Sequence, residues 1–422
     1  MMVFLSLPEN HPILNGLVQR VPITPTHKPS HLLRLYESLK VQTCKDFEWV
    51  IVPNNGADTS FLPQEDWIIS VIDTSGNKNI GAIKNFAFKQ GKGDWLAEVD
   101  HDDTLMPNCI EELIKVARED ICDFIYSDTI DLLPNNKSML FSSKHGWSHY
   151  PFQNDTAEYT INKTFLPTPQ SVARIWYAPN HIRVWKKSFY LAVGGHDTTL
   201  IALDDEDLLC RTYIHGRMHK IDKVLYIYYY HENNTFSHAE TNQWIRDNSD
   251  VIYEKYIHSM MRKWCQLNNL LIIDIGKRGT LKPDAQRVDL DTSNLKDDSV
   301  GLIFADNCLQ LYKHPVELMQ KIWKALSHGG MLISNTLSTD GRGAFQDPTY
   351  QSYWNANSFW YYTKSNLAAY HGSHLRFQST FIKDWFPSDY HKDMKLNYVI
   401  AHLTALKKDN SFSSAVPGII EI

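Results

Sequence analysis

The chain has 422 residues and a net charge of −6, with 42 Lys and Arg against 48 Asp and Glu. This length predicts two or three domains, and the apolar content of 43% is typical of a globular protein rather than a disordered one. The acidic balance excludes a general nucleic-acid-binding surface. The six cysteines lack the spacing of a disulfide framework, and no apolar run is long enough to cross a membrane, so we expect a cytoplasmic protein.

Strand and helix patterns alternate through the first half of the chain. A strand expected over residues 18–23 leads into Thr24-Pro25-Thr26, and a helix with Ser30 as its N-cap follows. Further strands are expected at residues 47–52, 67–72, 95–99, 124–127 and 224–230. The strand at 47–52 ends in a turn that contains Asn54 and Asn55, and a helix led by Gly81 precedes the strand at 95–99. This alternation predicts a parallel or mostly parallel sheet.

An acidic run, Asp100 to Asp103, follows the strand at 95–99 and holds three carboxylates in four residues. Open α/β sheets bind their ligands at the carboxyl ends of strands. Carboxylates this close repel one another, so we expect a cation here, and oxygen ligands favour Mg²⁺ or Mn²⁺. The alternative is a solvated turn that only ends the strand and caps the next helix.

A second acidic run, Asp204 to Asp207, opens a later helix. An acidic helix start is ordinary compensation of the helix dipole, but four acids in a row exceed what capping requires. The strand at 224–230 is followed by His231, which could bind a metal, contact a diphosphate, or do neither.

Together these motifs resemble the family 2 glycosyltransferases of GT-A fold, over about residues 18–235. The matching segments are Pro25–Pro29, Ser38–Glu48, Gly81–Asn85, Asp100–Asp103 and Asp204–Arg211. One departure is the turn Asn54–Ala57, where the family usually has an Asp-Asp-Gly-Ser turn whose acid contacts the nucleotide base. An amide can also hydrogen-bond a base edge, although it offers donors as well as acceptors.

The resemblance implies a metal-dependent, inverting transfer of a sugar from a nucleoside diphosphate sugar, with a UDP-sugar as the expected donor, to a hydroxyl of a glycan or glycoconjugate. It implies Asp205 as the general base, beside Asp204, which stands where the family usually has Glu. The implied ligands of Mn²⁺ or Mg²⁺ are Asp100, Asp102 and His231. The implied donor contacts are Thr24, Pro25, Thr26, Asn54, Asn55, Lys84 and Asp100. A homo-oligomer is left open.

The second half of the chain reads as a connecting helix at 236–267 and a smaller α/β domain at 268–422, after a first domain at 1–235. In the smaller domain we expect strands at 270–275, 300–305 and 331–335, and a helix at 316–326 that Gly329-Gly330 end.

This second domain resembles a class I S-adenosylmethionine-dependent methyltransferase in the segment that ends Asp274-Ile275-Gly276. However, Lys277 and Arg278 stand in the turn where glycines let the backbone approach the cofactor. The segment from Val288 also follows too soon for the usual helix. We therefore expect a trimmed Rossmann-like domain that does not bind S-adenosylmethionine. The alternatives are a bifunctional glycosyltransferase and methyltransferase, or a non-catalytic glycan-binding scaffold.

Overall fold

A computed structural model describes residues 20–143, 146–154, 157–175, 178–232, 234, 238–279, 281–371 and 375–407. The chain forms two compact units. Unit 1 comprises Met1–Leu140, His149–Leu166 and Pro179–Asp247, and unit 2 comprises Phe141–Ser148, Pro167–Ala178 and Asn248–Ile422. The boundaries expected at residues 235 and 267 differ from this division, because the long helix α7 (Ala239–Leu267) begins in unit 1 and ends in unit 2.

None of the helices in the described ranges combines the length and the apolar character that crossing a membrane requires.

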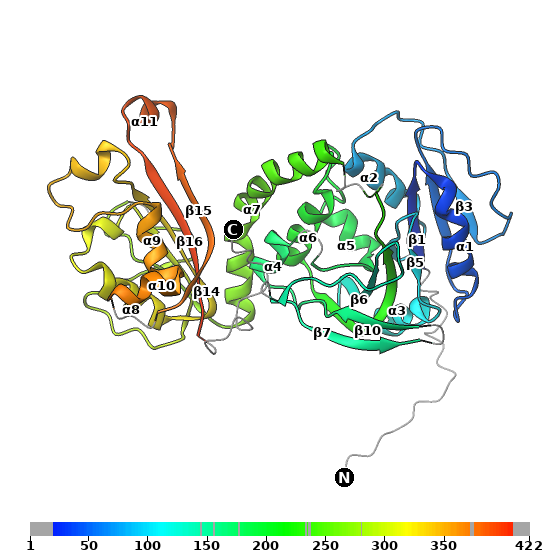
Figure 1. Ribbon diagram of the computed structural model, residues 1–422, viewed down its shortest axis with the longest axis horizontal. Helices are drawn as coiled ribbons and strands as arrows, with labels where there is room; N and C mark the ends of the chain where they lie inside the picture. Colours follow the sequence, from blue (N-terminus) through cyan, green and yellow to red (C-terminus); the bar gives the residue numbers. More distant parts are fainter. Residues whose placement is uncertain are drawn as a thin grey trace, which may run out of the picture. The chain divides into compact units, whose positions relative to one another are not determined.

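Unit 1 is built on one large sheet (Figure 1). Its strands are β1 (Arg20–Thr26), β2 (Trp49–Pro53), β3 (Ile68–Ser70), β4 (Trp95–Glu98), β5 (Thr104–Leu105), β6 (Phe124–Leu132), β7 (His149–Gln153), β8 (Glu158–Asn162), β9 (Arg183–Lys186) and β10 (Met218–Tyr229). The main order is β3-β2-β1-β4-β9-β6-β10-β5, with the β7–β8 hairpin joined to β6. Neighbouring strands β3, β2, β1 and β4 are parallel, whereas β9 runs antiparallel to both β4 and β6. This mixed, parallel-rich α/β fold is consistent with the predicted GT-A domain.

The helices of unit 1 are α1 (Leu32–Lys40), α2 (Ile80–Gln90), α3 (Cys109–Arg118), α5 (Lys187–Ala192) and α6 (Asp204–His215). One face of α1 is apolar, and its residues Leu35, Tyr36 and Leu39 are buried in the core that α1 and α3 share with the sheet. The predicted N-cap at Ser30 is wrong. A 3₁₀ turn at Pro29–His31 precedes the helix, and His31 occupies the N-cap position without a side-chain hydrogen bond.

The register of the parallel strands places several predicted site residues at one edge of the sheet. Thr26 pairs with Pro53 at the carboxyl ends of β1 and β2, and Ile23 of β1 pairs with Glu98 at the end of β4. The chain therefore leaves β1, β2 and β4 on the same side of the sheet, where a ligand-binding loop is expected.

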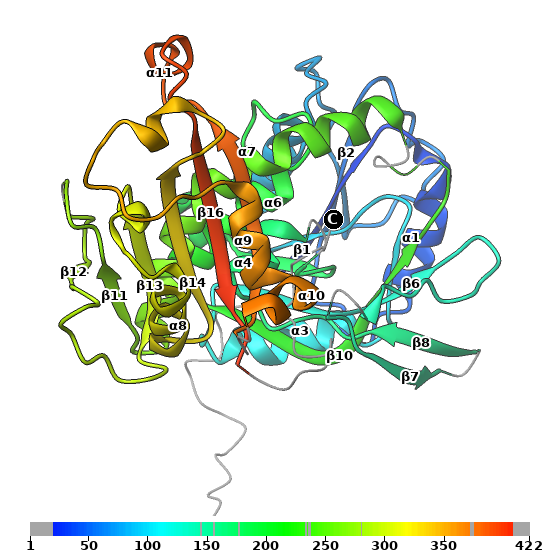
Figure 2. The same ribbon diagram turned by 60° about the vertical axis from the view of Figure 1, so that its left-hand side comes forward.

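Unit 2 contains a six-stranded sheet (Figure 2). Its strands are β11 (Leu271–Asp274), β12 (Gln286–Arg287), β13 (Val300–Asp306), β14 (Leu326–Leu337), β15 (Phe377–Trp385) and β16 (Tyr398–Ala405), in the order β12-β11-β13-β14-β16-β15. The first four are parallel, and β16 is antiparallel to β14 and β15. The helices are α4 (Pro169–Arg174), α8 (Pro315–Ala325), α9 (Ala356–Thr363), α10 (Ser365–Ala368) and α11 (Asp389–Asp393). A smaller α/β domain was expected here, and the sheet agrees with that fold class.

One helix end in unit 2 was predicted wrongly. Helix α8 ends at Ala325, and Gly329 and Gly330 lie inside β14 instead of ending the helix. Val300 of β13 pairs with Leu326, so strand pairing begins immediately after the helix and takes up the glycines.

Candidate active site

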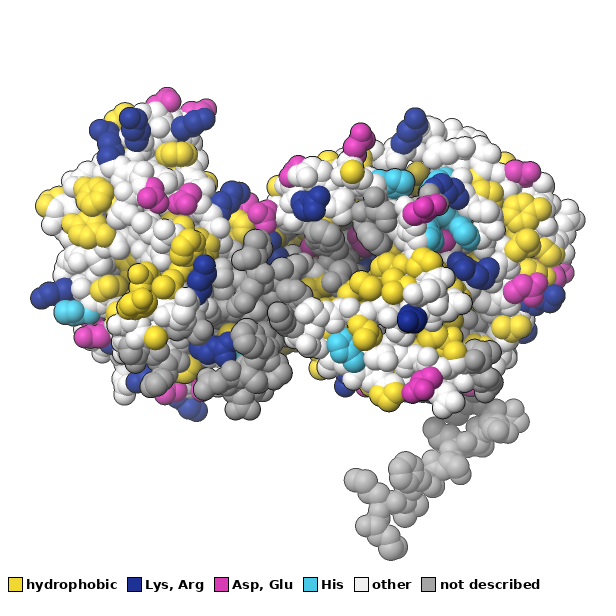
Figure 3. Space-filling view, viewed as in Figure 1, with side chains coloured by type: hydrophobic (Ala, Val, Ile, Leu, Met, Phe, Trp, Pro, Cys, Tyr) yellow, Lys and Arg dark blue, Asp and Glu magenta, His cyan; other side chains and the backbone are white. Residues whose placement is uncertain are grey.

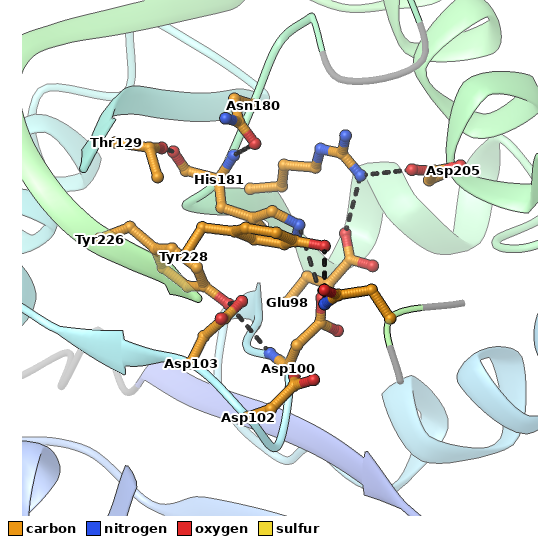
Figure 4. Close-up of polar contacts among 12 residues, drawn as sticks. Glu98, Asp100, Asp102, Asp103, Thr129, Asn180, His181, Asp205, Tyr226 and Tyr228 are labelled. Atoms are coloured by element: carbon orange, nitrogen blue, oxygen red, sulfur yellow. Dashed lines mark hydrogen bonds and ion pairs between the residues drawn. The ribbon is translucent and has the colours of Figure 1, made fainter. Parts of the chain in front are cut away.

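The acidic loop after β4 is anchored to β10 through Asp103. The Asp103 side chain is buried, and its two oxygens accept hydrogen bonds from the Tyr226 hydroxyl and the Tyr229 backbone N–H, each at 2.9 Å. The same Tyr226 hydroxyl accepts a bond from the Asp100 backbone N–H at 3.1 Å. Burial, followed by the neighbouring charges of Asp102 and Asp100, raises the pKa of Asp103 well above its ordinary value. Asp103 is therefore a structural carboxyl that fixes the loop (Figure 4).

Asp102 and His231, two of the predicted metal ligands, lie in contact. His231 Nε2 lies 2.7 Å from Asp102 Oδ2, although the two residues are 129 positions apart in the sequence. Arg34 donates a hydrogen bond to the Asp102 backbone oxygen and stacks on the Tyr229 ring, 3.6 Å from its centroid. Both members of the Asp102–His231 pair remain partly exposed, at 14% and 22% of their side-chain surface. The pair is therefore fixed from several elements and still open to a ligand.

Three further histidines surround this pair. The His31 ring stacks on His231 at 5.6 Å between centroids, and His101 lies 6.5 Å from His31 and 5.4 Å from His27. Figure 3 shows histidine side chains gathered near acidic ones on one part of unit 1. Burial lowers the pKa of His27 and of His31, and positive neighbours lower both further. His101, which lies inside the acidic run, is part of this group.

The predicted metal ligands provide a suitable donor set. Within the described parts of the chain, no three His, Cys, Asp or Glu side chains are already arranged as a metal site. The carboxylates of Asp100 and Asp102 and the imidazole of His231 are nevertheless ligand types that Mn²⁺ accepts, with phosphate oxygens to complete its shell. Asp100 is partly exposed, and its Oδ2 lies 3.6 Å from Nε2 of buried His181. The residues thus fit the ion chemically.

Lys84 lies among carboxylates from both acidic motifs. Its ammonium group contacts Glu98 Oε1 at 2.5 Å and lies 3.7 Å from Asp204 Oδ2. Burial alone would lower the pKa of Lys84, but the charges of Asp204, Glu98, Asp100 and Asp205 raise it well above the ordinary value. Lys84 is therefore a partly buried cation that lies among these acids.

The two acids at the start of α6 have different surroundings. Asp204 is buried, and burial raises its pKa to about 7 although Lys84 opposes the rise. Its Oδ2 has no hydrogen-bond partner among the residues that the structure describes, and it lies 3.7 Å from His196 Nε2. Asp205 keeps 25% of its side chain exposed, and Arg183 Nη1 donates to its Oδ2 at 2.7 Å. Burial would raise the pKa of Asp205, but Arg183 and Lys84 hold it below the ordinary value.

The predicted donor contacts on β1 and β2 lie together at the sheet edge. Thr24 is fully buried, and its hydroxyl accepts a hydrogen bond from Trp49 Nε1 at 2.9 Å, so this side chain is part of the core. Asn54 is also buried and bonds through its backbone N–H to the Thr26 carbonyl at 2.9 Å. Pro25 is half-buried and Asn55 is exposed. A role for these residues in donor binding stays a prediction.

The loop after β11 in unit 2 is closed by its own side chains. Asp274 accepts hydrogen bonds from the backbone N–H groups of Gly276 and Lys282 at 2.8 and 3.2 Å. Arg287 donates to the carbonyls of Gly276 and Gly279. Beside this loop is a pocket of about 220 Å³, and its lining includes Lys277, Asp291 and Tyr312. The pocket is smaller than the roughly 300–1,000 Å³ of ordinary small-molecule sites.

Four site residues escaped the sequence analysis. Glu98, Arg183 and His181 are buried polar residues at the ends of β4 and β9, and Tyr226 lies in the middle of β10. Glu98 lies two residues before Asp100, where the acidic run begins, and this proximity was the only available signal. The partners of the others come from distant segments, as with Tyr226 and Asp103, which are 123 positions apart.

Comparison with known proteins relates this part of the chain to one enzyme family. Residues 23–175 match the family described as Glycosyl transferase family 2. The chain is 27% identical to an uncharacterized glycosyltransferase of Haemophilus influenzae over 179 residues, which are 42% of this chain and 55% of that protein. It is 22% identical to the chondroitin synthase of Escherichia coli over 236 residues, which are 53% of this chain and 31% of that protein.

A solved structure, S. aureus TarS 1-349 in complex with UDP-GlcNAc, matches with a TM-score of 0.41 and 16% identity, over 57% of this chain and 72% of that chain. This chain thus spans about half the length of the Haemophilus protein and less of the synthase.

Proposed function

We propose, from the glycosyl transferase family 2 match over residues 23–175, that this protein is a nucleotide-sugar-dependent glycosyltransferase. The observation that best supports this is the position of Lys84. Its partly buried ammonium interacts with Glu98 and Asp100 at the end of β4 and with Asp204 and Asp205 at the start of α6. Both acidic motifs therefore belong to one site, which a solvated turn or a simple helix cap would not require.

On the donor side, Asp100, Asp102 and His231 would hold Mn²⁺ or Mg²⁺. When bound, such an ion neutralises the charge on a departing diphosphate. Asn54 and Asn55, at the end of β2, offer amide groups to a base edge, and we propose a UDP-sugar as donor. A scaffold that only binds glycans would not need this donor set beside a second acidic group.

On the acceptor side, Asp205 is the proposed general base. It takes the proton of the acceptor hydroxyl while the hydroxyl oxygen bonds the anomeric carbon and the bond from that carbon to the diphosphate oxygen breaks. One base opposite the leaving group gives inversion. Because Arg183 keeps the pKa of Asp205 low, the carboxylate is ionised at neutral pH. Its negative charge also stabilises the positive charge that develops on the sugar ring.

For unit 2 we propose a structural role without methyl transfer. The Asp274 carboxylate bonds its own loop, and Arg287 crosses the same loop to reach two of its carbonyls. Lys277 further narrows the adjoining pocket, where its ammonium pairs with Asp291 at 3.0 Å. These contacts favour the trimmed domain over the bifunctional alternative. A cytoplasmic location stays a prediction.

The proposal is tested by donor hydrolysis and transfer with a panel of nucleotide sugars, with and without Mn²⁺. Asp205→Asn should lower kcat by about 10²–10⁴-fold while donor binding stays unchanged. Asp102→Ala should abolish the Mn²⁺-dependent part of turnover. The control is Asp66→Asn, a change at an exposed carboxylate in the loop before β3, which should leave both activities unchanged. Absence of any hydrolysis by the wild-type protein across the panel would contradict the proposal.

A further inference from the structure

We propose that Arg183 is the positioning residue of the catalytic base: it holds the Asp205 carboxylate in place and links it to the strand that carries the acidic loop. This inference rests on the proposed function, in which Asp205 is the base. No sequence motif indicated Arg183, and its role follows from where β9 enters the sheet.

The position of Arg183 is set by strand pairing. It is the first residue of β9, and β9 runs antiparallel to β4 with Arg183 directly opposite Glu98. Opposite charges at facing positions of neighbouring strands stabilise the pair. Glu98 Oε2 lies 3.6 Å from Arg183 Nη1, and both side chains are almost completely buried, at 1% and 3% exposure. The end of β4 and the start of β9 are thus joined by charge as well as by the backbone.

The guanidinium group is restrained by contacts with three residues. Arg183 Nε donates to the Pro179 carbonyl at 2.9 Å, Nη1 donates to Asp205 Oδ2 at 2.7 Å, and Glu98 Oε2 lies 3.6 Å from the same Nη1. A guanidinium is planar and carries its donors in a fixed fork, so these contacts determine its orientation. In Figure 4, dashed lines lead to the carboxylates of Glu98 and Asp205, which lie near the segment that carries Asn180 and His181.

The carboxylate of Asp205 is held at both oxygens. Oδ2 accepts the bond from Arg183, and Oδ1 accepts the backbone N–H of Glu206 at 2.9 Å. An ionised carboxylate has about four acceptor positions, so positions remain for an acceptor hydroxyl. With a quarter of the side chain exposed, Asp205 is oriented without being closed off. A base that is already oriented needs less reorganisation when the acceptor arrives.

The charged groups around Asp205 determine the direction in which its pKa should shift when each of them is removed. Arg183 of β9 and Lys84 of α2 lower its pKa, whereas Glu98 of β4 raises it, and Asp204 lies beside it on α6. Removing the Arg183 charge should therefore raise the pH at which Asp205 takes up a proton. Removing the Glu98 charge should lower that pH. Because a purely structural role would predict loss of stability in both cases but no opposite shifts, the two variants separate the roles.

The experiment measures the pH profile of kcat for the wild type, Arg183→Gln, Arg183→Lys and Glu98→Gln. We expect the acid limb of Arg183→Gln to move upward by about one to three pH units, as expected for loss of an adjacent opposite charge, and that of Glu98→Gln to move downward. Arg183→Lys keeps the positive charge but loses the forked donors of the guanidinium. The acid limb of its pH profile should therefore stay near that of the wild type while kcat falls.

The matched control is Arg211→Gln. Arg211 forms a comparable partly buried pair with Asp207 on the same helix, with Nε at 2.9 Å from Asp207 Oδ2, and it should leave the acid limb unchanged. NMR titration of the Asp205 carboxyl carbon in the same proteins reports the shift without any need for activity. If Arg183→Gln fails to fold, Arg183→Lys and Glu98→Gln carry the test.

The inference would be overturned if Asp205 took up its proton at the same pH in Arg183→Gln as in the wild type. If Arg183→Gln does not fold, the inference would be overturned if that pH were not lower in Glu98→Gln than in the wild type. A titration that shifts as expected in a protein without any transferase activity would instead refute the proposed function alone.

Discussion

Asp131 is buried in β6, and Asn162 of β8 donates a hydrogen bond to its Oδ2 at 2.9 Å. Burial raises its pKa to about 7, and the hydrogen bonds from Asn162 and Asn180 only partly oppose this. The folded protein therefore binds a proton at Asp131 more tightly than the unfolded chain does. Its contribution to stability is complete below the ordinary carboxyl pKa and is lost as the pH rises through about 7.

Replacing Asp131 with Asn removes this pH dependence, because the amide cannot ionise and can still accept from Asn162. Between pH 5 and pH 8, we expect the free energy of unfolding of the variant to rise by about 1–3 kcal/mol relative to that of the wild type. This is less than the full free energy that corresponds to a pKa shift of this size. Thermal unfolding midpoints at the two pH values measure the change. An equal difference between the proteins at both pH values would contradict it.

Tyr226 is a second residue-scale test, since its hydroxyl bonds both Asp103 and the Asp100 backbone. Tyr226→Phe leaves a buried carboxyl without one donor, so we expect a loss of about 1–3 kcal/mol in unfolding free energy. Mn²⁺ activation should also weaken, because the loop carrying Asp102 is no longer fixed to β10. The control is Tyr370→Phe, at a residue that is 82% exposed, and it should change neither quantity. Wild-type stability in Tyr226→Phe would rule out this anchoring role.

At the scale of elements, helix α2 approaches the segment before α6 very closely at Gly81. A Cβ atom built there would lie 2.0 Å from the Asp197 carbonyl oxygen and 3.3 Å from Asp204 Cβ. The Gly81 backbone N–H also bonds the Leu200 carbonyl at 3.2 Å. Glycine is therefore required for α2 to bring Lys84, one turn later, next to the acids of α6.

Gly81→Ala should destabilise the protein by about 1–3 kcal/mol through overpacking, and it should lower kcat because Lys84 and Asp204 move apart. The comparison is Gly56→Ala, where a Cβ meets nothing within 4 Å and only the positive φ of 77° is strained. That variant should lose less stability and keep the helix contact. Equal kcat for Gly81→Ala and the wild type would show that the close approach does not position the site.

Elements with a strong pattern of their own could be predicted from the sequence. The buried face of α1 and the strand before the acidic loop follow from periodicity and from the carboxylates that end the strand. By contrast, β9 has only four residues between two helical stretches, and β5 has two, so pairing partners rather than pattern define them. The same reason hid Arg183. The residues predicted to contact ligands lie inside sequence motifs. The residues that hold them in position, such as Arg183, come from distant parts of the sequence and become neighbours only when the chain folds.

For the whole molecule, the prediction concerns which ligand stabilises the chain. A nucleoside diphosphate together with Mn²⁺ should raise the unfolding temperature of this 422-residue chain, because ligands that bind only the native state stabilise it. S-adenosylmethionine should not, since Asp274 and Arg287 already bond the loop after β11. Thermal shift assays and calorimetry on the intact chain measure both. Saturable micromolar binding of S-adenosylmethionine would overturn the view of unit 2 given above.

The place of β9 also bears on how unit 1 assembles. Strand β9 lies between β4 and β6 in the sheet, yet about fifty residues separate the end of β6 from the start of β9. During synthesis, strands β1 to β4 and strand β6 emerge before β9. The strand that joins β4 to β6 is β9, and it is complete only when residue 186 has emerged. We expect folding to be slow and dominated by distant pairings, with two unfinished sheet edges exposed until β9 is inserted. A nascent chain stopped before β9 should therefore be prone to aggregation and to binding by chaperones.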